Sequence, residues 1–587
     1  MSAVRKRWQV AAQDSEAARY LARESAISPV VAQLLVNRGL RSPAAAREFL
    51  RSPMAGLHAP RLVPGVTEAA EKLLAAVRAN QRICIYGDYD VDGTTGTAIL
   101  MRLLTILNAK VEFHVPNRII DGYGLNGETL RKLADDGVQW VVSVDCGISA
   151  VKEVAEATAL GLKIIVTDHH EFAAMLPQAE VLVHPRLPGS NYPTTAGLCG
   201  AGVAFKLAWA TAQLASGSDK VAPEFREFLL DSLALAALGT VADVMALTDE
   251  NRVFVKHGLE RSNKRPLPGI KALCIAAGLK PEHPIKAEDI GYKIGPRLNA
   301  AGRLECARLV VELLTTSNPV KAREIAEYLE DLNTRRQTVE RKITAEAKEM
   351  VESRDQGDDP ALVVASTEWH QGVVGIVASR LVDHFGKPSL VIAVRDGDEL
   401  SAGSGRSTAG LPLHEVLTAC GEHLEGSGGH AAAAGFKVRP HKIDDLRTAF
   451  NDYVRTHFHG TPPTPVLAIE AEVPLMALTY GLLEDLEKLE PYGTGNARPR
   501  FLAAGLQIEG TPRRIGQGER HLSFSITQDG MKIRAVAFGF GERLDELMAQ
   551  GGACSLVFVP KLNEWNGRRT VEMEVIDFQA GAVPTFD

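Results

Sequence analysis

Three short apolar runs in the first third of the chain each end in acidic or histidine residues. The runs are residues 82–86, 140–144 and 163–167, and stretches of helical character separate them. Such an alternation is typical of an open parallel α/β sheet. Because the carboxyl ends of parallel strands share one edge of the sheet, the pattern predicts a ligand site at that edge.

The residues directly after these runs are of the types that bind divalent metals. They are Asp88, Asp90 and Asp92 after the first run, Asp145 after the second, and Asp168, His169 and His170 after the third. In an extended segment alternate side chains face the same way, so we expect the first three carboxylates to converge, with Gly87 and Gly93 allowing the backbone to turn. A single aspartate after a strand is usually a helix cap, but capping does not explain acids at every second position. Crowded carboxylates need a cation that keeps them ionised.

A further acidic residue lies in a different kind of segment. Residues 230–245 form a mostly apolar run that predicts a buried helix, and Asp243 lies near its end. A carboxylate in apolar surroundings needs a partner. Carboxylates with one or two imidazoles suit Mn²⁺ or Mg²⁺, and the histidine favours Mn²⁺. Paired ions of this kind support phosphodiester hydrolysis.

The composition is that of an ordinary globular protein with several domains. At 587 residues the chain exceeds what one hydrophobic core supports, so about three or four domains are expected. The net charge of −7 excludes a uniformly basic nucleic-acid binder, but not a nuclease whose acids hold metals. The amino terminus lacks the apolar core of a signal peptide, and no run approaches ~18 apolar residues, so we expect no membrane attachment and a cytoplasmic location.

The cysteine pattern argues against disulfides and against a zinc site. None of the seven cysteines belongs to a CxxC pair, so we expect reduced, mostly buried thiols. Cys146 adjoins Asp145, and we prefer a packing role for it over a nucleophilic one.

Changes of pattern along the chain indicate five segments. They are a polar helical segment (1–54), an α/β domain (55–317), a connecting helix (318–355), a smaller α/β domain (356–460) and a β-barrel (461–587). The Pro-rich residues 461–465 mark the last boundary. Short strands expected at 522–527, 533–538 and 555–559, with a hairpin turn at Asn566-Gly567, predict the barrel.

The connecting segment predicts one long helix. Asn318 and Pro319 form a good helix start, and apolar residues recur at helical spacing within a charged run. The simplest interpretation is a solvated spacer. Its basic residues could instead contact a phosphate backbone; they are Arg335, Arg336, Arg341 and Lys342.

Several motifs are similar, in order and spacing, to those of the DHH phosphoesterase superfamily. DYDVDG, VSVDCG, VTDHH and the Asp243 segment resemble its four motifs. The similarity continues through IGPRLNAAGR (294–303), SGR (404–406) and GSGGHAAAAG (426–435), which resembles the companion DHHA1 domain. PYGTGNARP (491–499) resembles the entry to an OB-like domain. Together they are similar to the branch of single-strand-specific 5′-to-3′ DNA exonucleases.

The resemblance implies an α/β fold in which a parallel-sheet DHH domain is joined by a long helix to a smaller α/β DHHA1 domain, followed by a C-terminal OB-like β-barrel. It also implies two metal ions, Mn²⁺ or Mg²⁺. One ion is expected on Asp92, Asp145, His169 and Asp243, and the other on Asp90 and the bridging Asp145, with Asp88 as a further ligand. His170 is expected to face the scissile phosphate and Asp168 to orient a histidine.

The resemblance further implies residues that bind DNA phosphates. They are Arg118, Arg297, Arg303, Ser404, Arg406, Gly428, Gly429 and His430. Ser404 and Arg406 are the strongest candidates for a pocket that takes the 5′ end, since arginine offers a planar fork matched to phosphate oxygens. The run Gly428–His430 predicts a glycine turn that opens a helix, where free N–H groups favour an anion.

The function implied is a Mn²⁺- or Mg²⁺-dependent exonuclease that degrades single-stranded DNA from the 5′ end to mononucleotides in recombination and repair. A single-strand binding protein and a helicase would be its partners, and we expect a monomer. Two alternatives stay open: a DHH phosphodiesterase acting on short oligonucleotides or cyclic dinucleotides, and a non-catalytic scaffold that binds single-stranded DNA. The complete set of expected ligands argues against the scaffold. Whether the barrel binds DNA, docks a protein or is purely structural stays open.

Overall fold

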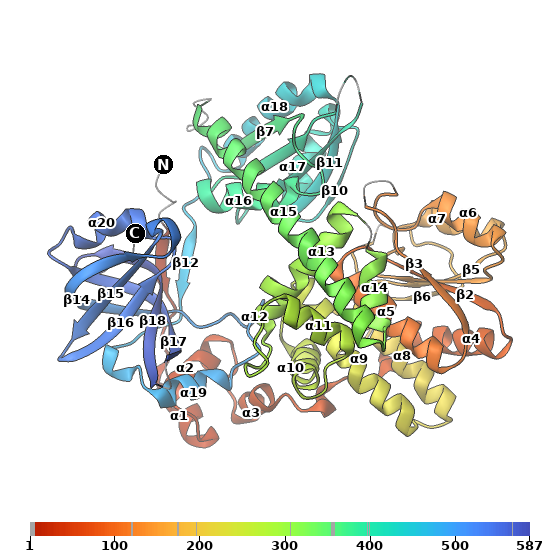
Figure 1. Cartoon of the computed structure of the whole chain (residues 1–587), viewed down its shortest axis with the longest axis horizontal. Coiled ribbons are helices and arrows are strands. Elements are labelled where there is room, and N and C mark those ends of the chain that lie inside the picture. The colour runs from red at the N-terminus through yellow and green to blue at the C-terminus, as the bar shows by residue number, and fades with distance from the viewer. Residues whose placement is uncertain are drawn as a thin grey trace. The chain divides into compact units, whose positions relative to one another are not determined.

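The computed structural model divides the chain into two compact units (Figure 1). It describes residues 6–118, 121–172, 175–194, 196–305, 307–353, 359–395, 397, 399–565 and 568–586. Unit 1 contains Met54–Pro463 and Gly493–Gly495, and unit 2 contains the segment up to Pro53, Thr464–Tyr492 and Asn496–Asp587. No described helix combines the length and the apolar character that crossing a membrane requires.

The first sheet of unit 1 is parallel throughout, as the sequence predicts. Its strands are β2 (Arg82–Gly87), β3 (Lys110–His114), β4 (Trp140–Val144), β5 (Lys163–Thr167) and β6 (Val181–Val183). Their order is β3-β2-β4-β5-β6. The carboxyl ends of β2, β4 and β5 are therefore neighbours, and the residues after each of them meet at one edge.

Helices cover both faces of this sheet (Figure 1). On one face lie α4 (Val66–Arg78), α5 (Val91–Ile106) and α8 (Gly200–Ser216), and on the other α6 (Gly127–Asp135) and α7 (Val151–Ala159). Alternate residues of β2 serve the two faces: Ile83 and Ile85 pack against the first set, and Cys84 and Tyr86 against the second. Burial on both faces explains why the strands are continuous apolar runs.

A helical layer extends the first core. Its members are α9 (Pro223–Ala242), α10 (Asp249–Lys264), α11 (Pro268–Ala276), α12 (Ala287–Asp289), the π-turn η3 (Ile290–Ile294), α13 (Gly295–Leu304) and α14 (Arg308–Thr315). Asp243 immediately follows α9 and is its C-cap residue. The predicted buried helix thus ends one residue before the acid, which leaves the carboxylate at a helix end instead of inside the helix.

The connecting helix α15 spans Pro319–Ser353 without interruption. Ala322, Leu329 and Leu332 belong to the core of the first sheet, whereas Ile343 and Ala347 belong to the core of the second. The expectation of a solvated spacer is therefore wrong, because one stripe of the helix is buried along most of its length. Of its basic residues, Arg336 is buried, while Arg335, Arg341 and Lys342 are exposed.

The second sheet of unit 1 is mixed, with order β10-β11-β9-β8-β7. Its strands are β7 (Leu362–Ser366), β8 (Ser389–Ala393), β9 (Ser401–Arg406), β10 (Gly426–Gly429) and β11 (Ala433–Val438). Helix α16 (Val374–Phe385) packs with α15 on one face, and α17 (Leu413–Ala419) and α18 (Ile443–His457) cover the other. Only β7 and β8 are parallel neighbours.

The helix predicted after Gly428–His430 is wrong, since Gly428 and Gly429 end strand β10 and residues 430–432 form the turn of a β-hairpin. Strand β11 pairs with β9 along its whole length, and Ala434 lies opposite Gly405. A Cβ on Gly403 would lie 2.2 Å from the Phe436 ring, so this glycine makes room for the aromatic side chain in the sheet. Pairing in the sheet thus overrides the helix propensity of the alanine run.

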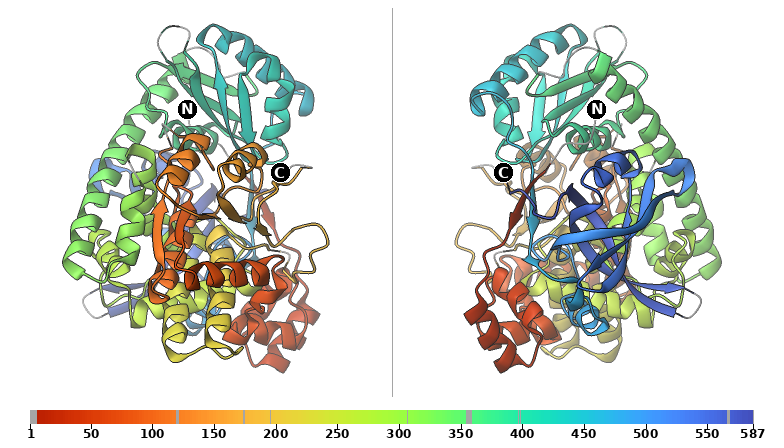
Figure 2. Two further views of the ribbon diagram at one scale, coloured as in Figure 1. Left: turned by 90° about the vertical axis from the view of Figure 1, so that its right-hand side faces the viewer. Right: turned by 90° about the vertical axis from the view of Figure 1, so that its left-hand side faces the viewer.

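Unit 2 contains the carboxyl-terminal barrel and the amino-terminal segment (Figure 2). The barrel strands are β14 (Phe501–Ile515), β15 (His521–Gln528), β16 (Met531–Ala537), β17 (Ala553–Trp565) and β18 (Arg568–Ala580), with α19 (Tyr480–Glu487), α20 (Leu544–Met548) and the short β13 (Ala471–Glu472) beside them. Pairing of β14 with β17 closes the five-stranded barrel that the sequence predicts. The turn residues Asn566 and Gly567 lie outside the described residues.

The amino-terminal segment shares the core of the barrel. Its helices are α1 (Ser15–Ser25), α2 (Pro29–Asn37) and α3 (Pro43–Arg51). Leu21 and Leu35 pack in the same apolar cluster as Phe501 and Phe558. A short strand that the sequence pattern did not indicate, β1 (Arg7–Val10), pairs in parallel with β12 (Val466–Ile469).

Six cysteines are free thiols, as expected. Cys84, Cys146, Cys199, Cys420 and Cys554 are buried and Cys274 is half-buried. Cys306 lies outside the described residues. Burial raises the pKa of Cys146 well above its ordinary value, which keeps it a neutral packing residue.

Candidate metal centre

The acidic triplet occupies the junction between β2 and α5. The Asp90 side chain caps α5 by accepting a hydrogen bond from the Gly93 N–H at 3.0 Å. Asp92 lies within the first helical turn, so the expectation of one extended segment with alternating side chains is wrong for this residue. Glycine is required at position 93 because a Cβ there would lie 2.7 Å from the backbone of Asp88, and not because the backbone turns there.

Asp92 is held by the start of α8. Its carboxylate accepts hydrogen bonds from the backbone N–H of Gly200 and, at 2.8 Å, of Ala201. Two glycines leave space for the acids: a Cβ on Gly239 would lie 2.4 Å from Asp92 Oδ1, and a Cβ on Gly200 would lie 2.5 Å from Asp145 Cβ. Gly239 and Gly200 therefore leave the space that the Asp92 and Asp145 side chains occupy, and a larger residue at either position would fill it.

The imidazole of His169 faces three carboxylates. Its Nε2 atom lies 3.0 Å from Asp145 Oδ1, 3.7 Å from Asp243 Oδ2 and 3.8 Å from Asp92 Oδ2. Asp145 follows β4 with a φ of 65°, a left-handed backbone conformation that is rare for residues other than glycine. Residues separated by more than 150 positions in the sequence thus converge on one point.

The possible ligand atoms form overlapping groups. Within each group, the atoms lie no more than 4.8 Å apart; the groups are Asp92, His169 and Asp243; Asp88, Asp90 and Asp145; and Asp145, His169 and His170. Asp145 belongs to the second and third groups. Its Oδ1 atom also lies 3.0 Å from Nε2 of His169, which is a member of the first group. This arrangement suits a pair of ions that share one carboxylate.

Three buried polar atoms at this point have no hydrogen-bond partner among the described residues. They are Asp88 Oδ1, Asp145 Oδ1 and His169 Nε2. Burial raises the pKa of Asp88, Asp92 and Asp145 above the ordinary value, and raises that of Asp243 to about 9. Burial also lowers the pKa of His169 to about 4, which leaves Nε2 free to act as a ligand. Divalent cations would satisfy these atoms and restore the ionised carboxylates, so the residues fit a metal centre.

Asp168 contacts both histidines of the third motif. Its carboxylate accepts hydrogen bonds from the His169 N–H at 2.7 Å and from the Ile148 N–H at 2.9 Å, and lies 2.8 Å from His170 Nδ1. Burial acts to raise the pKa of Asp168, but the hydrogen bond and charge of His170, the Ile148 N–H and the charge of His169 together outweigh it and hold the pKa at about 2. Burial lowers and the Asp168 hydrogen bond raises the pKa of His170, with a net increase.

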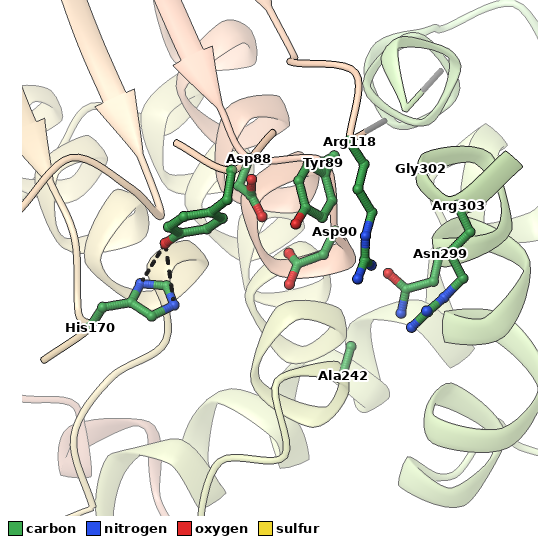
Figure 3. A pocket seen from close by; sticks show the side chains of 10 residues that line it. Asp88, Tyr89, Asp90, Arg118, His170, Ala242, Asn299, Gly302 and Arg303 are labelled. Carbon is green, nitrogen blue, oxygen red and sulfur yellow. Dashed lines mark hydrogen bonds between the residues drawn. The ribbon is translucent and has the colours of Figure 1, made fainter. Parts of the chain in front are cut away.

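A cavity of about 290 Å³ adjoins the carboxylates (Figure 3). On one side it is lined by Asp88 and Asp90, and on the other by Arg118, Asn299 and Arg303. The Arg118 guanidinium lies 5.2 Å from the centre of the Tyr89 ring, which also lines the cavity. The cavity thus places cationic groups opposite the candidate metal ligands.

The guanidinium groups around this cavity repel one another. Burial and then the neighbouring Arg118, Arg336 and Arg406 lower the pKa of Arg303 to about 10. Arg303 Nη1 donates to the Gly372 carbonyl at 3.2 Å, and Arg406 Nη1 donates to Ser404 Oγ at 3.2 Å. Clustered cations of this kind would be stabilised by a phosphate group.

Arg297 lies elsewhere. It forms an ion pair with Glu330 of α15 and donates to the Lys293 carbonyl at 2.7 Å, and it does not line the cavity. Its contacts join α13 to α15. The sequence motif that contains both arginines therefore supplies one residue that lines the cavity, Arg303, and one that joins two helices, Arg297.

The hairpin β10–β11 brings His430 to the other side of the centre. Its ring is stacked on that of His170, with centroids 6.4 Å apart and planes inclined by 12°. A second cavity, of about 320 Å³, is lined by His169, Asp243, Arg186 and His430. His170 lines both cavities, so the candidate metal ligands lie between them. Gly428 and Gly429 lie in β10, where Gly429 adopts a φ of 143° that opens the turn.

Sequence reasoning missed four residues of the site. Tyr123 Oη donates to the Asp145 carbonyl at 3.1 Å and lies 3.2 Å from His170 Nδ1. Arg186 Nη2 donates to the His169 carbonyl at 2.7 Å. Asn299 could have been found, because it precedes Arg303 by four positions on a helix and so shares its face. Tyr89 and Tyr123 lie in loops, where spacing carries no such signal.

The two sheets of unit 1 and the clustered acids and histidines define a protein of the DHH type with a metal centre. The family described as "DHH family, N-terminal domain" matches residues 82–237, the "DHHA1 domain" matches 358–456, and the "RecJ OB domain" matches 469–577.

Several similar proteins are named RecJ. The "Single-stranded-DNA-specific exonuclease RecJ" of Bacillus subtilis is 36% identical over 587 residues, which is 100% of this chain and 72% of that protein. The crystal structure of RecJ from Thermus thermophilus in complex with Mn²⁺ has a TM-score of 0.83 and 32% identity, covering 98% of this chain and 80% of the other. The structure of the same protein in complex with Mg²⁺ has a TM-score of 0.77 and 30% identity, covering 98% and 79%. The chain belongs to the RecJ family.

Proposed function

We propose that this protein is a metal-dependent exonuclease that hydrolyses single-stranded DNA from the 5′ end and acts in DNA recombination and repair. The observation that carries the proposal is the pair of carboxylate groups joined through Asp145, beside a cavity with a cationic wall. The names of the relatives support the substrate. The 5′-to-3′ direction and the mononucleotide products go beyond those names and are part of our proposal.

The ligand groups suggest which residues would bind each of the two ions. Asp92, His169 and Asp243, with Asp145, would hold one Mn²⁺ or Mg²⁺, and Asp88, Asp90 and Asp145 the other. Bound ions of this kind supply a nucleophilic water at neutral pH and offset the charge that develops on phosphate oxygens. The protein's part is to seat the carboxylates, and the glycine cradles at Gly200 and Gly239 do so.

His170 is the residue that would meet the scissile phosphate. It lines both cavities, and its hydrogen bond with Asp168 fixes the ring and raises its pKa. A protonated His170 would donate a hydrogen bond to a phosphate oxygen or give a proton to the leaving oxygen. Asp168 then has a positioning role.

The cationic cavity is our candidate for the 5′ terminus. Arg118 and Arg303 line it, and Arg406 with Ser404 lies close enough to influence both guanidiniums. A cavity of about 290 Å³ is at the low end of the range for ligand sites, which suits one terminal nucleotide. Binding of the end in this cavity would place one phosphodiester at the ions and release nucleoside 5′-monophosphates.

The second cavity would take the strand beyond the cut. His430 and Arg186 line it and offer donors to phosphate oxygens, whereas Gly428 and Gly429 shape the turn that presents His430. Arg297 is withdrawn from this scheme because Glu330 pairs with it.

Other features of the proposal rest on the sequence and the resemblance alone. They are a cytoplasmic site of action, a monomeric state, and cooperation with a single-strand binding protein and a helicase. The barrel could bind DNA or a partner.

The direct test follows the products of labelled strands. Single-stranded DNA labelled at the 5′ or the 3′ end, duplex DNA, and short oligoribonucleotides would be incubated with and without Mn²⁺. We expect immediate release of the 5′ label as a mononucleotide, gradual shortening of the 3′-labelled strand, and no reaction without metal.

Three outcomes contradict the proposal in different ways. Release of mononucleotides from the 3′ end alone would overturn the direction. Activity confined to dinucleotides would favour the phosphodiesterase alternative, and binding of DNA without any hydrolysis would favour the scaffold.

A further inference from the structure

A third cavity, of about 620 Å³, lies along the connecting helix of unit 1. Helix α15 forms one wall with seven residues, η3 and α13 contribute Tyr292 and Pro296, and α16 contributes Arg380. The α15 residues are Arg336, Gln337, Glu340, Arg341, Thr344 and Lys348, with Ala345 between them. None of these residues lines either cavity at the metal centre.

The charge of this cavity is opposite to that of the whole chain. Four lining residues are basic and one is acidic, in a protein of net charge −7. Glu340 is shared between two of the cations: Arg336 Nη1 donates to Oε2 at 2.6 Å and Arg380 Nε donates to Oε1 at 3.0 Å. With four basic residues and one acidic residue, the lining keeps an excess of positive charge and therefore favours an anion.

Two observations indicate that the lining lacks a partner. The buried hydroxyl of Thr344 has no hydrogen-bond partner among the described residues. Burial lowers the pKa of Lys348 and of Arg336, and outweighs the opposing effects of Glu352 on Lys348 and of Glu340 on Arg336. A bound anion would accept from the hydroxyl and stabilise the cations.

Tyr292 gives the cavity an aromatic side. Its side chain is 83% exposed, although large aromatic residues usually bury most of their surface. An exposed ring beside cationic groups is the combination that binds a base together with its phosphate. The volume lies within the range of sites for small molecules.

We propose that this cavity is a second nucleotide site, in which Arg341 and Lys348 bind the phosphate and Tyr292 stacks on the base. The inference rests on the proposed function only for the source of the ligand, which is either the mononucleotide product or a nucleotide of the strand. Arg336 lines this cavity, and its charge also lowers the pKa of Arg303 in the active-site cavity. An anion bound in this cavity would therefore change the electrostatic potential at Arg303.

The test maps the site without using activity. The full chain would be irradiated with 8-azido-deoxyadenosine monophosphate in one arm, and in the other with a single strand that carries internal azidoadenine and a blocked 5′ end. Labelled peptides would be identified by mass spectrometry. We expect labelling at Tyr292 or along 336–348, with the more strongly labelled arm identifying the source.

Variants keep the result interpretable. Arg341→Glu with Lys348→Glu should reduce this labelling about tenfold or more, as removal of two phosphate contacts predicts. Tyr292→Ser should reduce it as well, and its exposed position makes misfolding no concern. Lys342→Glu is the matched control, because Lys342 is a basic residue of the same helix that does not line the cavity.

Labelling that is absent from these peptides in both arms, or that survives the double substitution unchanged, would overturn the inference. Nuclease activity on a short strand serves as an independent readout. The double variant should retain it, whereas loss of the proposed function would appear as an inactive wild-type protein whatever the labelling result.

Discussion

A Cβ placed on Gly239 would lie 2.4 Å from the Oδ1 atom of Asp92. Helix α9 therefore approaches Asp92 more closely at position 239 than any residue other than glycine would permit. Gly239 lies in the interior of α9, where glycine weakens a helix by roughly 1 kcal/mol relative to alanine. The helix is therefore weakened locally in return for the position of a carboxylate.

Gly239→Ala should lower the affinity for Mn²⁺ and the nuclease activity, and should also lower stability, because the added Cβ would lie 2.8 Å from Ala201 Cβ. The added methyl group must displace the Asp92 carboxylate from the point it shares with His169 and Asp243. Calorimetric titration with Mn²⁺ measures the effect. Gly202→Ala is the matched control, because a Cβ there meets its neighbours at 3.4 Å or more; equal affinity in both variants would contradict the cradle.

Asp145→Ala should reduce turnover by two to three orders of magnitude, about 3 to 4 kcal/mol of transition-state stabilisation, as the loss of one electrostatic anchor predicts. The reason is that Asp145 belongs to two of the ligand groups. Single-turnover rates at saturating Mn²⁺ measure the change. Asp136→Ala, at an acid in the turn after α6, is a control, and near-normal turnover of the Asp145 variant would contradict a shared ligand.

Binding of Mn²⁺ should release protons and strengthen as the pH rises. The folded, metal-free protein holds the pKa of Asp243 at about 9 through burial, against an ordinary value of 3.8. Between these values the folded chain carries a proton that the unfolded chain lacks, so the metal-free fold is most stable at low pH and loses that contribution as the pH rises through 9. The ion must displace this proton, which makes its affinity increase over the same window.

Titrations in buffers of different ionisation enthalpy count the released protons. Asp243→Asn should bind Mn²⁺ weakly, and its metal-free stability should depend less on pH. A wild-type affinity that is constant from pH 6 to pH 8.5 would contradict the raised pKa values.

Arg303→Ala and Arg297→Ala should differ in kind. Arg303 lines the cationic cavity, so its loss should remove the preference for a 5′-phosphate over a 5′-hydroxyl terminus. Arg297 is paired with Glu330, so its loss should leave that preference unchanged and at most lower stability. Competition between the two kinds of strand end measures the preference, and an equal loss in both variants would be the contrary result.

Glu250→Ala should destabilise unit 1 by roughly 3 to 5 kcal/mol, because it leaves a buried lysine without its partner. Lys206 Nζ donates to Glu250 Oε2 at 2.6 Å, and neither side chain is exposed. Urea denaturation measures the change in unfolding free energy. Lys206→Met combined with Glu250→Leu should recover part of the loss, and failure to do so would place the effect in the hydrogen bonds with Tyr192 and His58 or in packing instead of in the charge pair.

The fold followed from the sequence wherever local pattern and tertiary contacts agree. The runs that became β2, β4 and β5 are buried on both faces, so continuous apolar stretches identified them. The alanines of β11 misled, because their partners in β9 lie almost thirty positions earlier and no local pattern reveals them. Strand β1 was missed for the same reason, since it pairs with β12 at the other end of the chain.

For the site, residue types were predictable and backbone geometry was not. Asp88, Asp90 and Asp92 do gather with Asp145, but they do so across a strand–helix junction, where Asp92 is helical. Tyr123 contacts the site through loop geometry, and Arg297 leaves it because Glu330 lies within reach on α15. Roles as metal or phosphate ligands stay predictions until the experiments above are done.

Helix α15 has a consequence for how the gene of this protein can vary. Because its near end is sealed into one core and its far end into another, an insertion of a single amino acid between Asn333 and Val339 would rotate everything downstream by about 100° and advance it by ~1.5 Å. Ile343 and Ala347 would keep their contacts only if the second core turned with them relative to the first. A point substitution at an exposed position of this stretch leaves the register of the helix unchanged, but a change of length does not.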